Sequence, residues 1–539
     1  MTEPRYRWGM IPTPGRFPRS RRDWLRPAAV LLVAVLVVTG VMTAAPWLAA
    51  RLSCRDGLPA GDVYAADGEC VGITEGPYAF DIPEFEGVFG RIEAQNGAAA
   101  GACVEGREPV TVGVLMSLTH PNSGARALHE LEGFAAGQRR ANQPGCSRAL
   151  RLRVGHTGSA EQAAIELARR FREDSRIAAV VGLGLSGINA AEAANLLGAK
   201  SDENGMNPVP MVADLITAEG FDSDGTPPAA GCDEEATFTR GIGGNNNFFR
   251  VAFRNGLQVE ELAEYLGTDN RPTFIAIPDD SRDPYTCTTL QPIRELYQQQ
   301  QPQVPEVQFS VTNEATVAQV ARRVCDAEGA VTAFYTARSR DLGRFLAGLA
   351  KRYEDGLCAG ESVTVVSTSD AARMRVPEVD PGLEAPRRKA LTSSSFADGR
   401  LRLIYTPLAD PDALRSSGAG GGSEFAELER LFEEMTFDGA HLDDGWGINA
   451  YDAVYTVAKA VESLDSDRPV TRALVRGAIA DFSAADEGAQ LIGANGPIRF
   501  ENNGNRVGTP VTVRLCPLDS EGRTHTVTQI GAPGDRTSC

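Results

Sequence analysis

The strongest constraint on the fold is an alternation of short apolar runs with longer amphipathic stretches, which begins at Val110 and continues toward the C-terminus. Runs rich in Val, Ile and Ala predict strands that are buried on both faces, and the stretches between them are long enough for helices. Such an alternation is typical of parallel sheets covered by helices. The predicted strands of a first round are residues 110–118, 152–156, 177–182 and 209–213, and those of a second round are residues 273–277, 307–311, 331–335 and 363–367.

The two rounds predict an α/β fold of two doubly wound, Rossmann-like lobes joined by a hinge. A chain of 539 residues is long enough to bury two or more cores. The segment FFRVAFRN, residues 248–255, is interpreted as an extended crossover between the lobes. We expect residues 109–249 plus 378–469 to form lobe 1 and residues 250–377 plus 470–539 to form lobe 2. The Gly-, Pro- and acid-rich residues 51–108 predict an extracytoplasmic spacer.

The N-terminal part of the chain predicts a membrane anchor. Residues 27–50 carry no charged side chain and follow an Arg-rich segment. A run of this length can cross a bilayer as one helix, and an Arg-rich flank stays in the cytoplasm. We therefore expect a cytoplasmic tail (1–26), a single-pass transmembrane anchor in the cell membrane (27–50) and a large extracytoplasmic domain. A cleaved signal peptide is the alternative. Lipidation of Cys54 is disfavoured, because Arg51 stands where an apolar residue is required.

All ten cysteines follow the predicted anchor, which fits disulfide bonding in an oxidising compartment. The sequence does not determine their pairing, and pairing between nearest neighbours is our hypothesis: Cys54 with Cys70, Cys103 with Cys146, Cys232 with Cys287, Cys325 with Cys358, and Cys516 with Cys539. The sequence has no Cys-x-x-Cys pair and no cysteine cluster flanked by histidine, so we expect no metal site. The formal net charge of −18 argues against a nucleic-acid partner.

The sharpest local motif is GLGLSG at residues 182–187, which satisfies G-x-G-x-x-G between a predicted strand and a predicted helix. A dinucleotide site requires an acidic residue about 20 positions further on, and Asp214 comes well after that position. A hydrolase elbow requires G-x-S-x-G, and Ile188 stands in the place of its last glycine. We therefore expect no cofactor, no catalytic residue and no enzyme. Glycines and Ser186 at the start of a helix can nevertheless hold a carboxylate.

Several segments resemble, in their order along the chain, those of the type I periplasmic binding proteins, and especially the group that binds branched-chain amino acids. They are VTVGVLMSLTHPNSGARALHELEGFAAGQRRAN, IAAVVGLGLSG, FFRVAFRN, FIAIPDDSRDPY, AYDAVYTVAKAVE and GPIRFENNGNRV. The resemblance implies an extracytoplasmic substrate-binding protein that captures an amino acid or a related small acid between two lobes for an ABC-type importer, with a permease as its membrane partner. A membrane-anchored ligand sensor or protein-interaction module on the same fold is the alternative.

The resemblance also implies a set of ligand-binding residues, namely Ser186, Gly187, Ala213, Thr217, Tyr285, Arg338 and Asp370. Ser186 would bind the ligand carboxylate, and Asp370 would pair with a ligand ammonium group. Where amino-acid binders have a Gly-Gly-Tyr type of turn after the strand that ends at Tyr335, this chain has Thr-Ala-Arg-Ser-Arg. Arg338 of this turn is expected to bind an anionic group of the ligand.

Overall fold

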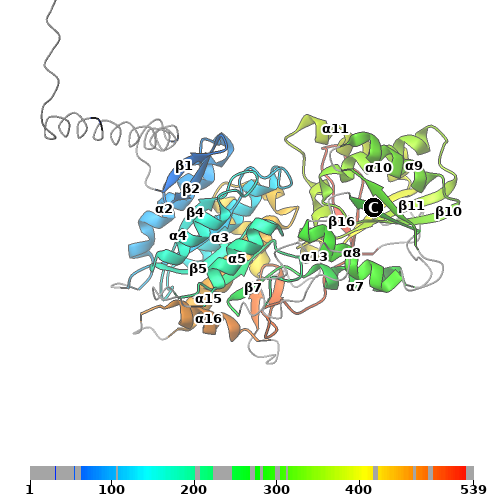
Figure 1. The fold of residues 1–539 in the computed structure, drawn as a ribbon. Coiled ribbons are helices and arrows are strands. Elements are labelled where there is room, and N and C mark those ends of the chain that lie inside the picture. Colours follow the sequence, from blue (N-terminus) through cyan, green and yellow to red (C-terminus); the bar gives the residue numbers. More distant parts are fainter. Residues whose placement is uncertain are drawn as a thin grey trace, which may run out of the picture. The chain divides into compact units, whose positions relative to one another are not determined.

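The computed structural model describes residues 31, 54, 62–104, 107–200, 207–222, 246–267, 273–278, 283–297, 304–310, 313–416, 423–464, 469–483, 490–529 and 539. The chain divides into two compact units, Met1–Ala65 and Ala66–Cys539, and strand β1 (Val63–Ala66) spans their boundary. The second unit contains two sheets with their covering helices, here called lobe 1 and lobe 2 (Figure 1). The predicted α/β fold with two lobes is therefore confirmed.

Lobe 1 is built on a mainly parallel sheet, in which the order within the second unit is β2-β4-β3-β5-β6-β7. Strand β2 is antiparallel to β4, and the other neighbours are parallel. The bounds are β2 (Glu69–Thr74), β3 (Val110–Met116), β4 (Leu150–His156), β5 (Ile177–Gly182), β6 (Met211–Ala213) and β7 (Phe248–Arg250). Every residue of β5 is buried, as expected of a central strand covered on both faces.

Two pairs of helices cover this sheet: α3 packs against α15, and α4 packs against α5. The helices of lobe 1 are α2 (Glu86–Ala102), α3 (Arg126–Ala141), α4 (Ala164–Glu173), α5 (Ile188–Gly198), α14 (Glu424–Glu434), α15 (Trp446–Ser463) and α16 (Arg472–Ala480), with short 3-10 turns η1 (Pro83–Phe85) and η4 (Gly439–Leu442). A two-stranded sheet of β13 (Leu491–Gly493) and β14 (Gly496–Ile498) follows α16.

Lobe 2 has a second sheet of the order β16-β15-β12-β11-β10-β8-β9. Strands β8 to β12 are parallel, while β15 and β16 are antiparallel additions at one edge. The strands are β8 (Phe274–Pro278), β9 (Glu306–Phe309), β10 (Gly329–Tyr335), β11 (Gly360–Ser367), β12 (Leu401–Tyr405), β15 (Val513–Leu515) and β16 (Thr526–Val527). The helices are α7 (Asn255–Leu266), α8 (Pro284–Tyr297), α9 (Glu314–Cys325), α10 (Leu342–Glu354), α11 (Pro381–Leu391), α12 (Ser394–Ala397) and α13 (Pro411–Ser416), with 3-10 turns η2 (Ser339–Asp341) and η3 (Ser369–Arg375).

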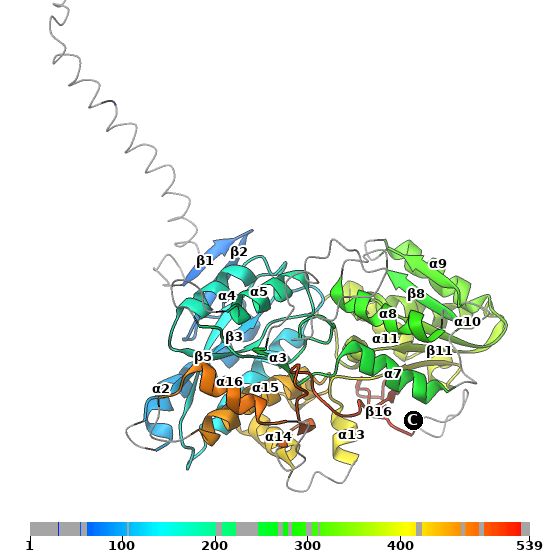
Figure 2. The ribbon, with the colours of Figure 1, turned by 60° about the horizontal axis from the view of Figure 1, so that its bottom comes forward.

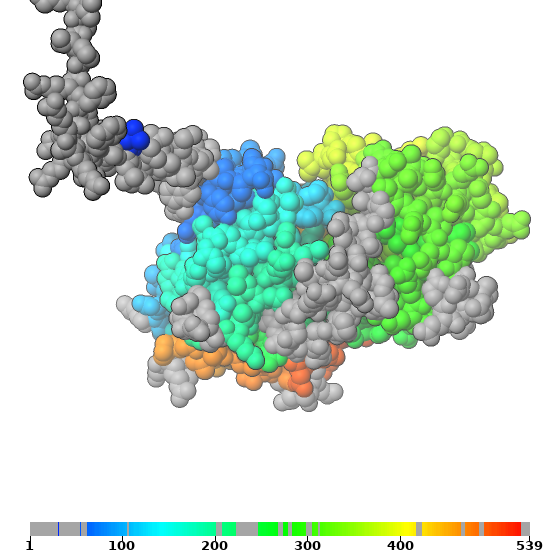
Figure 3. Space-filling view, in the orientation of Figure 1, coloured from blue at the N-terminus to red at the C-terminus, as the bar shows by residue number. Residues whose placement is uncertain are grey.

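The predicted strands form with bounds that differ by a few residues, but the expected lobe boundaries need correction in several places. Residues 69–102, expected to be part of a spacer, contribute β2 to the sheet and α2 to the helices of lobe 1. Residues 381–416, assigned to lobe 1, form α11, α12, β12 and α13 of lobe 2. Helix α16, assigned to lobe 2, packs on α15 and β5 of lobe 1; its orange segment lies against the cyan and teal of lobe 1 (Figures 2 and 3).

The cysteine hypothesis is confirmed for three pairs: Cys103–Cys146, Cys325–Cys358 and Cys516–Cys539. Three further cysteines, namely Cys54, Cys70 and Cys287, are disulfide-bonded as well, and Cys232 lies outside the described residues. No helix in the described part of the chain is both long and apolar enough to cross a membrane. The predicted tail and anchor, residues 1–50, lie outside that part except for Leu31.

Candidate functional site

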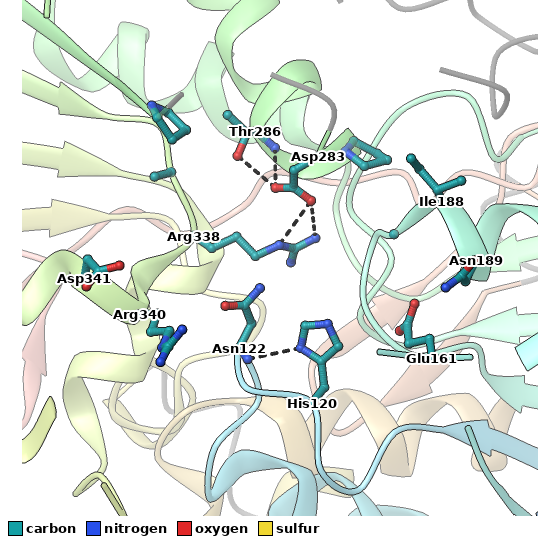
Figure 4. Close-up of a pocket in the computed structure, with 14 residues that line it drawn as sticks. His120, Asn122, Glu161, Ile188, Asn189, Asp283, Thr286, Arg338, Arg340 and Asp341 are labelled. Atoms are coloured by element: carbon teal, nitrogen blue, oxygen red, sulfur yellow. Dashed lines mark hydrogen bonds and ion pairs between the residues drawn. The ribbon is translucent and has the colours of Figure 1, made fainter. Parts of the chain in front are cut away.

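A cavity of about 460 Å³ lies where the two lobes face each other, and it is called the interlobe cavity below. Lobe 1 contributes loop residues that follow β3, β4 and β5, while lobe 2 contributes residues that follow β8 and β10. These are the carboxyl ends of parallel strands, where open α/β sheets bind ligands. The polar lining residues drawn in Figure 4 are His120, Asn122, Glu161, Asn189, Asp283, Thr286, Arg338, Arg340 and Asp341.

Arg338 reaches from lobe 2 into the middle of the cavity (Figure 4). Its Nη2 lies 3.0 Å from Oδ1 of Asp283 and donates to the backbone oxygen of Ser186 in lobe 1 at 2.9 Å. The guanidinium also lies 4.8 Å from the centroid of the Tyr285 ring. Asp283 in turn accepts hydrogen bonds from the amide and hydroxyl of Thr286. Arg338 is therefore held by three directional contacts, and one of them crosses from lobe 2 to lobe 1.

The wall from lobe 1 carries two titratable side chains with shifted pKa values. Nδ1 of His120 accepts the N–H of Asn122 at 3.0 Å. Burial, together with the nearby charge of Arg338, lowers the pKa of His120 to about 4. The imidazole is therefore neutral near pH 7, with its proton on Nε2. Burial raises the pKa of Glu161 to about 7, so this carboxyl is partly protonated near neutral pH and can then donate a hydrogen bond.

The glycine motif at residues 182–187 makes room for Glu161. A Cβ on Gly184 would lie 2.8 Å from Oε1 of Glu161, and a Cβ on Gly187 would lie 3.0 Å from Oε2. Gly184 also has a φ of +75°, which side chains with a Cβ rarely adopt. The motif therefore allows a buried carboxyl to approach the backbone at the start of α5, which explains its glycines without a dinucleotide.

Two of the residues implied by the resemblance, Ser186 and Thr217, form a buried contact at this motif. The hydroxyl of Ser186 accepts the N–H of Thr217 at 3.0 Å and that of Ala218 at 3.2 Å. Ala213 is the last residue of β6 and is fully buried. Gly187 lines the interlobe cavity, whereas Ser186, Ala213 and Thr217 are not among its lining residues. The Ser186 hydroxyl thus joins the loop after β5 to the loop after β6.

The two remaining residues implied for lobe 2, Tyr285 and Asp370, lie behind Arg338. The hydroxyl of Tyr285 lies 2.6 Å from Oγ1 of Thr368 and accepts the N–H of Asp370 at 3.3 Å. Oδ1 of Asp370 pairs with Nη1 of Arg126 from lobe 1 at 3.0 Å. Neither Tyr285 nor Asp370 lines the cavity, and of the seven implied residues only Gly187 and Arg338 do.

Sequence reasoning missed His120, Asn122, Glu161, Asp283 and Arg340 as lining residues. Two of these positions could have been found, because His120 and Asn122 follow the first predicted strand of the fold at its carboxyl end. Arg340 stands two residues after Arg338 in the same turn. Glu161 gives no such signal, since its burial depends on glycines that come later in the chain.

No family model matches the sequence, and no curated protein matches it. Solved structures match its fold. The branched-chain amino acid transporter substrate binding protein of Streptococcus pneumoniae, in complex with isoleucine, has a TM-score of 0.51 and 13% identity over 78% of this chain and 99% of its own. An ABC transporter substrate-binding protein of Sphaerobacter thermophilus has a TM-score of 0.51 and 18% identity over 79% and 98%. A solute binding protein of R. palustris, in complex with 4-hydroxybenzoate, has a TM-score of 0.53 and 12% identity over 80% and 98%.

These structures cover both lobes of the present chain, and the match extends over almost the whole length of each of them. Identities of 12–18% establish a shared arrangement of elements and leave the ligand open. The expected two-lobed architecture is confirmed by this comparison. The chain has the fold of the type I periplasmic binding proteins.

Proposed function

We propose that this chain is an extracytoplasmic solute-binding protein, which encloses a small polar ligand between its two lobes and catalyses no reaction. The interlobe cavity carries the proposal: it measures about 460 Å³, and both lobes contribute hydrogen-bonding side chains to its walls (Figure 4). A cavity of this size suits a small organic molecule. A ligand that touches both walls binds the closed arrangement of the lobes more tightly than an open one, and it therefore stabilises the closed arrangement.

The neighbours in fold support the same proposal. Their structures contain isoleucine and 4-hydroxybenzoate, two small molecules that each carry a carboxylate. The neighbours from Sphaerobacter thermophilus and R. palustris are also described as parts of ABC transporters. Delivery of the captured solute to an ABC-type importer is accordingly the role that we propose.

We further propose that the protein is tethered to the cell membrane by residues 27–50, with both lobes on the extracytoplasmic side. The support is the uncharged run itself and the arginines before it. Disulfides throughout the second unit, such as Cys103–Cys146 and Cys325–Cys358, are typical of proteins in an oxidising compartment. A tethered binding protein would stay close to its permease.

The proposal is tested by a thermal-shift screen of the full-length chain in detergent against amino acids, organic acids, sugars and nucleosides. A ligand at about 100 times its dissociation constant stabilises the folded state by about 2.7 kcal/mol. Arg338→Gln should remove the shift, because Arg338 lies in the middle of the cavity. Arg400→Gln is the matched control, since the Arg400 side chain is exposed and pairs only with Asp398 among the described carboxylates. Absence of any shift, with no small molecule co-purifying by mass spectrometry, would contradict the proposal.

A further inference from the structure

A buried ion pair joins the two lobes next to the interlobe cavity. Arg126, the first residue of α3 in lobe 1, pairs with Asp370 of η3 in lobe 2, and their side chains are only 1% and 6% exposed. The guanidinium lies 4.2 Å from the centroid of the Trp446 ring and donates to the backbone oxygens of Asn122 and Ser123. Arg126 is thus fixed from several sides.

The negative charge of Asp370 is already compensated by this chain. Burial alone would raise the pKa of Asp370, but the guanidinium groups of Arg126 and Arg338 outweigh burial, so the pKa lies below its ordinary value. Its Oδ2 accepts the N–H of Ser339 at 2.8 Å, so both carboxylate oxygens have partners. A ligand ammonium group could pair with Asp370 only by displacing Arg126.

Two other acidic groups of the cavity are already paired with arginines of this chain. Asp283 pairs with Arg338, and Asp341 pairs with Arg344 at 2.6 Å. Glu161 is the remaining described carboxyl in the lining, and its burial favours the neutral form. An ammonium group that enters a desolvated site without an anionic partner is strongly disfavoured. Apart from Glu161, which is partly protonated near neutral pH, the described lining therefore offers no uncompensated carboxylate to the ammonium group of an amino acid.

One cationic side chain of the cavity, in contrast, is not paired with any described carboxylate. Arg340 lines it and is exposed, and no described carboxylate lies within ion-pair distance of its guanidinium. The neutral imidazole of His120 and the side chain of Asn122 face the same space as Arg340 (Figure 4). These groups together can donate several hydrogen bonds to a carboxylate.

We propose that Arg126 is a built-in cation in the position of a ligand ammonium group at Asp370, so that the interlobe cavity selects small carboxylic acids without an α-ammonium group over α-amino acids of the same skeleton. This inference rests on the proposed function and names its ligand class. The favoured ligands are 2-oxo and 2-hydroxy acids and other acids that lack the amine. Arg126 thereby acts as a specificity-determining residue without lining the cavity itself.

The test measures affinities of the full-length chain by calorimetry for matched pairs: L-leucine with 4-methyl-2-oxopentanoate, and L-glutamate with 2-oxoglutarate. The 2-oxo acid of at least one pair should bind at least tenfold more tightly than its amino acid. Arg126→Met keeps an unbranched side chain over Trp446 and exposes the charge of Asp370, so this variant should gain at least tenfold in affinity for the amino acid. Arg340→Gln is the matched control, which should weaken binding of the oxo acid without any gain for the amino acid.

Equal or tighter binding of the amino acids by the unmodified chain would overturn the inference and leave the proposed function standing. Binding of no solute in any class would overturn both. If Arg126→Met does not fold, Asp370→Asn replaces it, since this change keeps the shape of the side chain and leaves Arg126 as an uncompensated cation. Asp370→Asn should retain or strengthen the preference for the oxo acid, and loss of that preference would overturn the inference.

Discussion

Gly133 of α3 lies directly against Gly447 of α15: a Cβ on Gly133 would come within 2.2 Å of the Gly447 carbonyl oxygen. The two helices therefore pack with their backbones in contact. Both helices begin beside the ion pair between the lobes, because Arg126 is the first residue of α3 and Trp446 is the first residue of α15. The close packing of α3 and α15 thus sets the position of Arg126 relative to the ring beneath it.

We expect Gly133→Ala to lower the free energy of unfolding by roughly 3 kcal/mol, because its Cβ would overlap backbone that has no room to move. Urea denaturation would measure this loss. Gly97→Ala in α2 is the control: a Cβ there meets nothing within 4 Å, so the change should be neutral or stabilise the helix by up to about 1 kcal/mol. Equal effects of the two substitutions would contradict the close packing.

Ser186→Ala should destabilise the protein and weaken ligand binding together. The change leaves the buried N–H groups of Thr217 and Ala218 without their acceptor, at a cost of about 1–3 kcal/mol. The loop that carries Gly187 would then lose its link to the loop after β6. Thermal melting and calorimetry would measure the two effects. Ser416→Ala, at an exposed serine that donates to the Ala413 carbonyl oxygen, should change neither.

The raised pKa values of Asp214 and Glu130 predict that the free energy of unfolding falls as the pH rises. Burial raises the pKa of Asp214 to about 7, and burial together with the charge of Asp214 raises the pKa of Glu130. The folded state therefore binds more protons than the unfolded chain, in which an Asp has a pKa near 4. This contribution to stability is fully present below about pH 4 and is lost as the pH passes through 7.

Asp214→Asn removes one of these two charges, so the variant should be more stable than the unmodified chain at pH 8, and the gain should shrink at pH 5.5. Denaturation of both proteins at the two pH values would measure the difference. His120 and His156, whose pKa values burial lowers to about 4, act in the opposite direction in both proteins and cancel in the comparison. A gain that is independent of pH would contradict the assignment.

Arg472 connects α16 to the end of α4. Its guanidinium donates to the backbone oxygens of Phe171, Arg172, Asp174, Ile177 and Asn207. A lysine cannot reproduce this fork of donors, so Arg472→Lys should lower the melting temperature by several degrees, equivalent to roughly 2 kcal/mol. Arg476→Lys on the same helix is the control, because among the described residues Arg476 donates to one carbonyl oxygen, that of Asn246. Calorimetric melting of the two variants should separate them.

The sequence predicted the strands well, because their periodicity is local: β5 and β10, for example, lie within a few residues of their expected bounds. Membership of a lobe is not local, and β12 and α16 were therefore assigned to the wrong lobes. Nothing in the pattern around β12 specifies which strand becomes its neighbour, since its partners lie on distant segments of the chain.

The same limit applies to the site. Arg338 was expected to contact the ligand and lies in the cavity, because a cationic residue in the turn after a strand is visible in the sequence. The pairing of Asp370 with Arg126 was not expected, since it depends on how two lobes meet. Asp370, which the resemblance assigned to a ligand ammonium group, is paired with Arg126 from the opposite lobe.

The chain crosses between the lobes more than once, and this order of elements affects when each lobe can fold during synthesis. Helix α15, which packs on α3 of lobe 1, is synthesised after all the parallel strands of lobe 2, and β15 and β16 complete the lobe 2 sheet only near the C-terminus. Neither lobe can close its core on a nascent chain that still lacks these segments. We therefore expect the polypeptide to acquire its native structure only after nearly the whole chain has been synthesised.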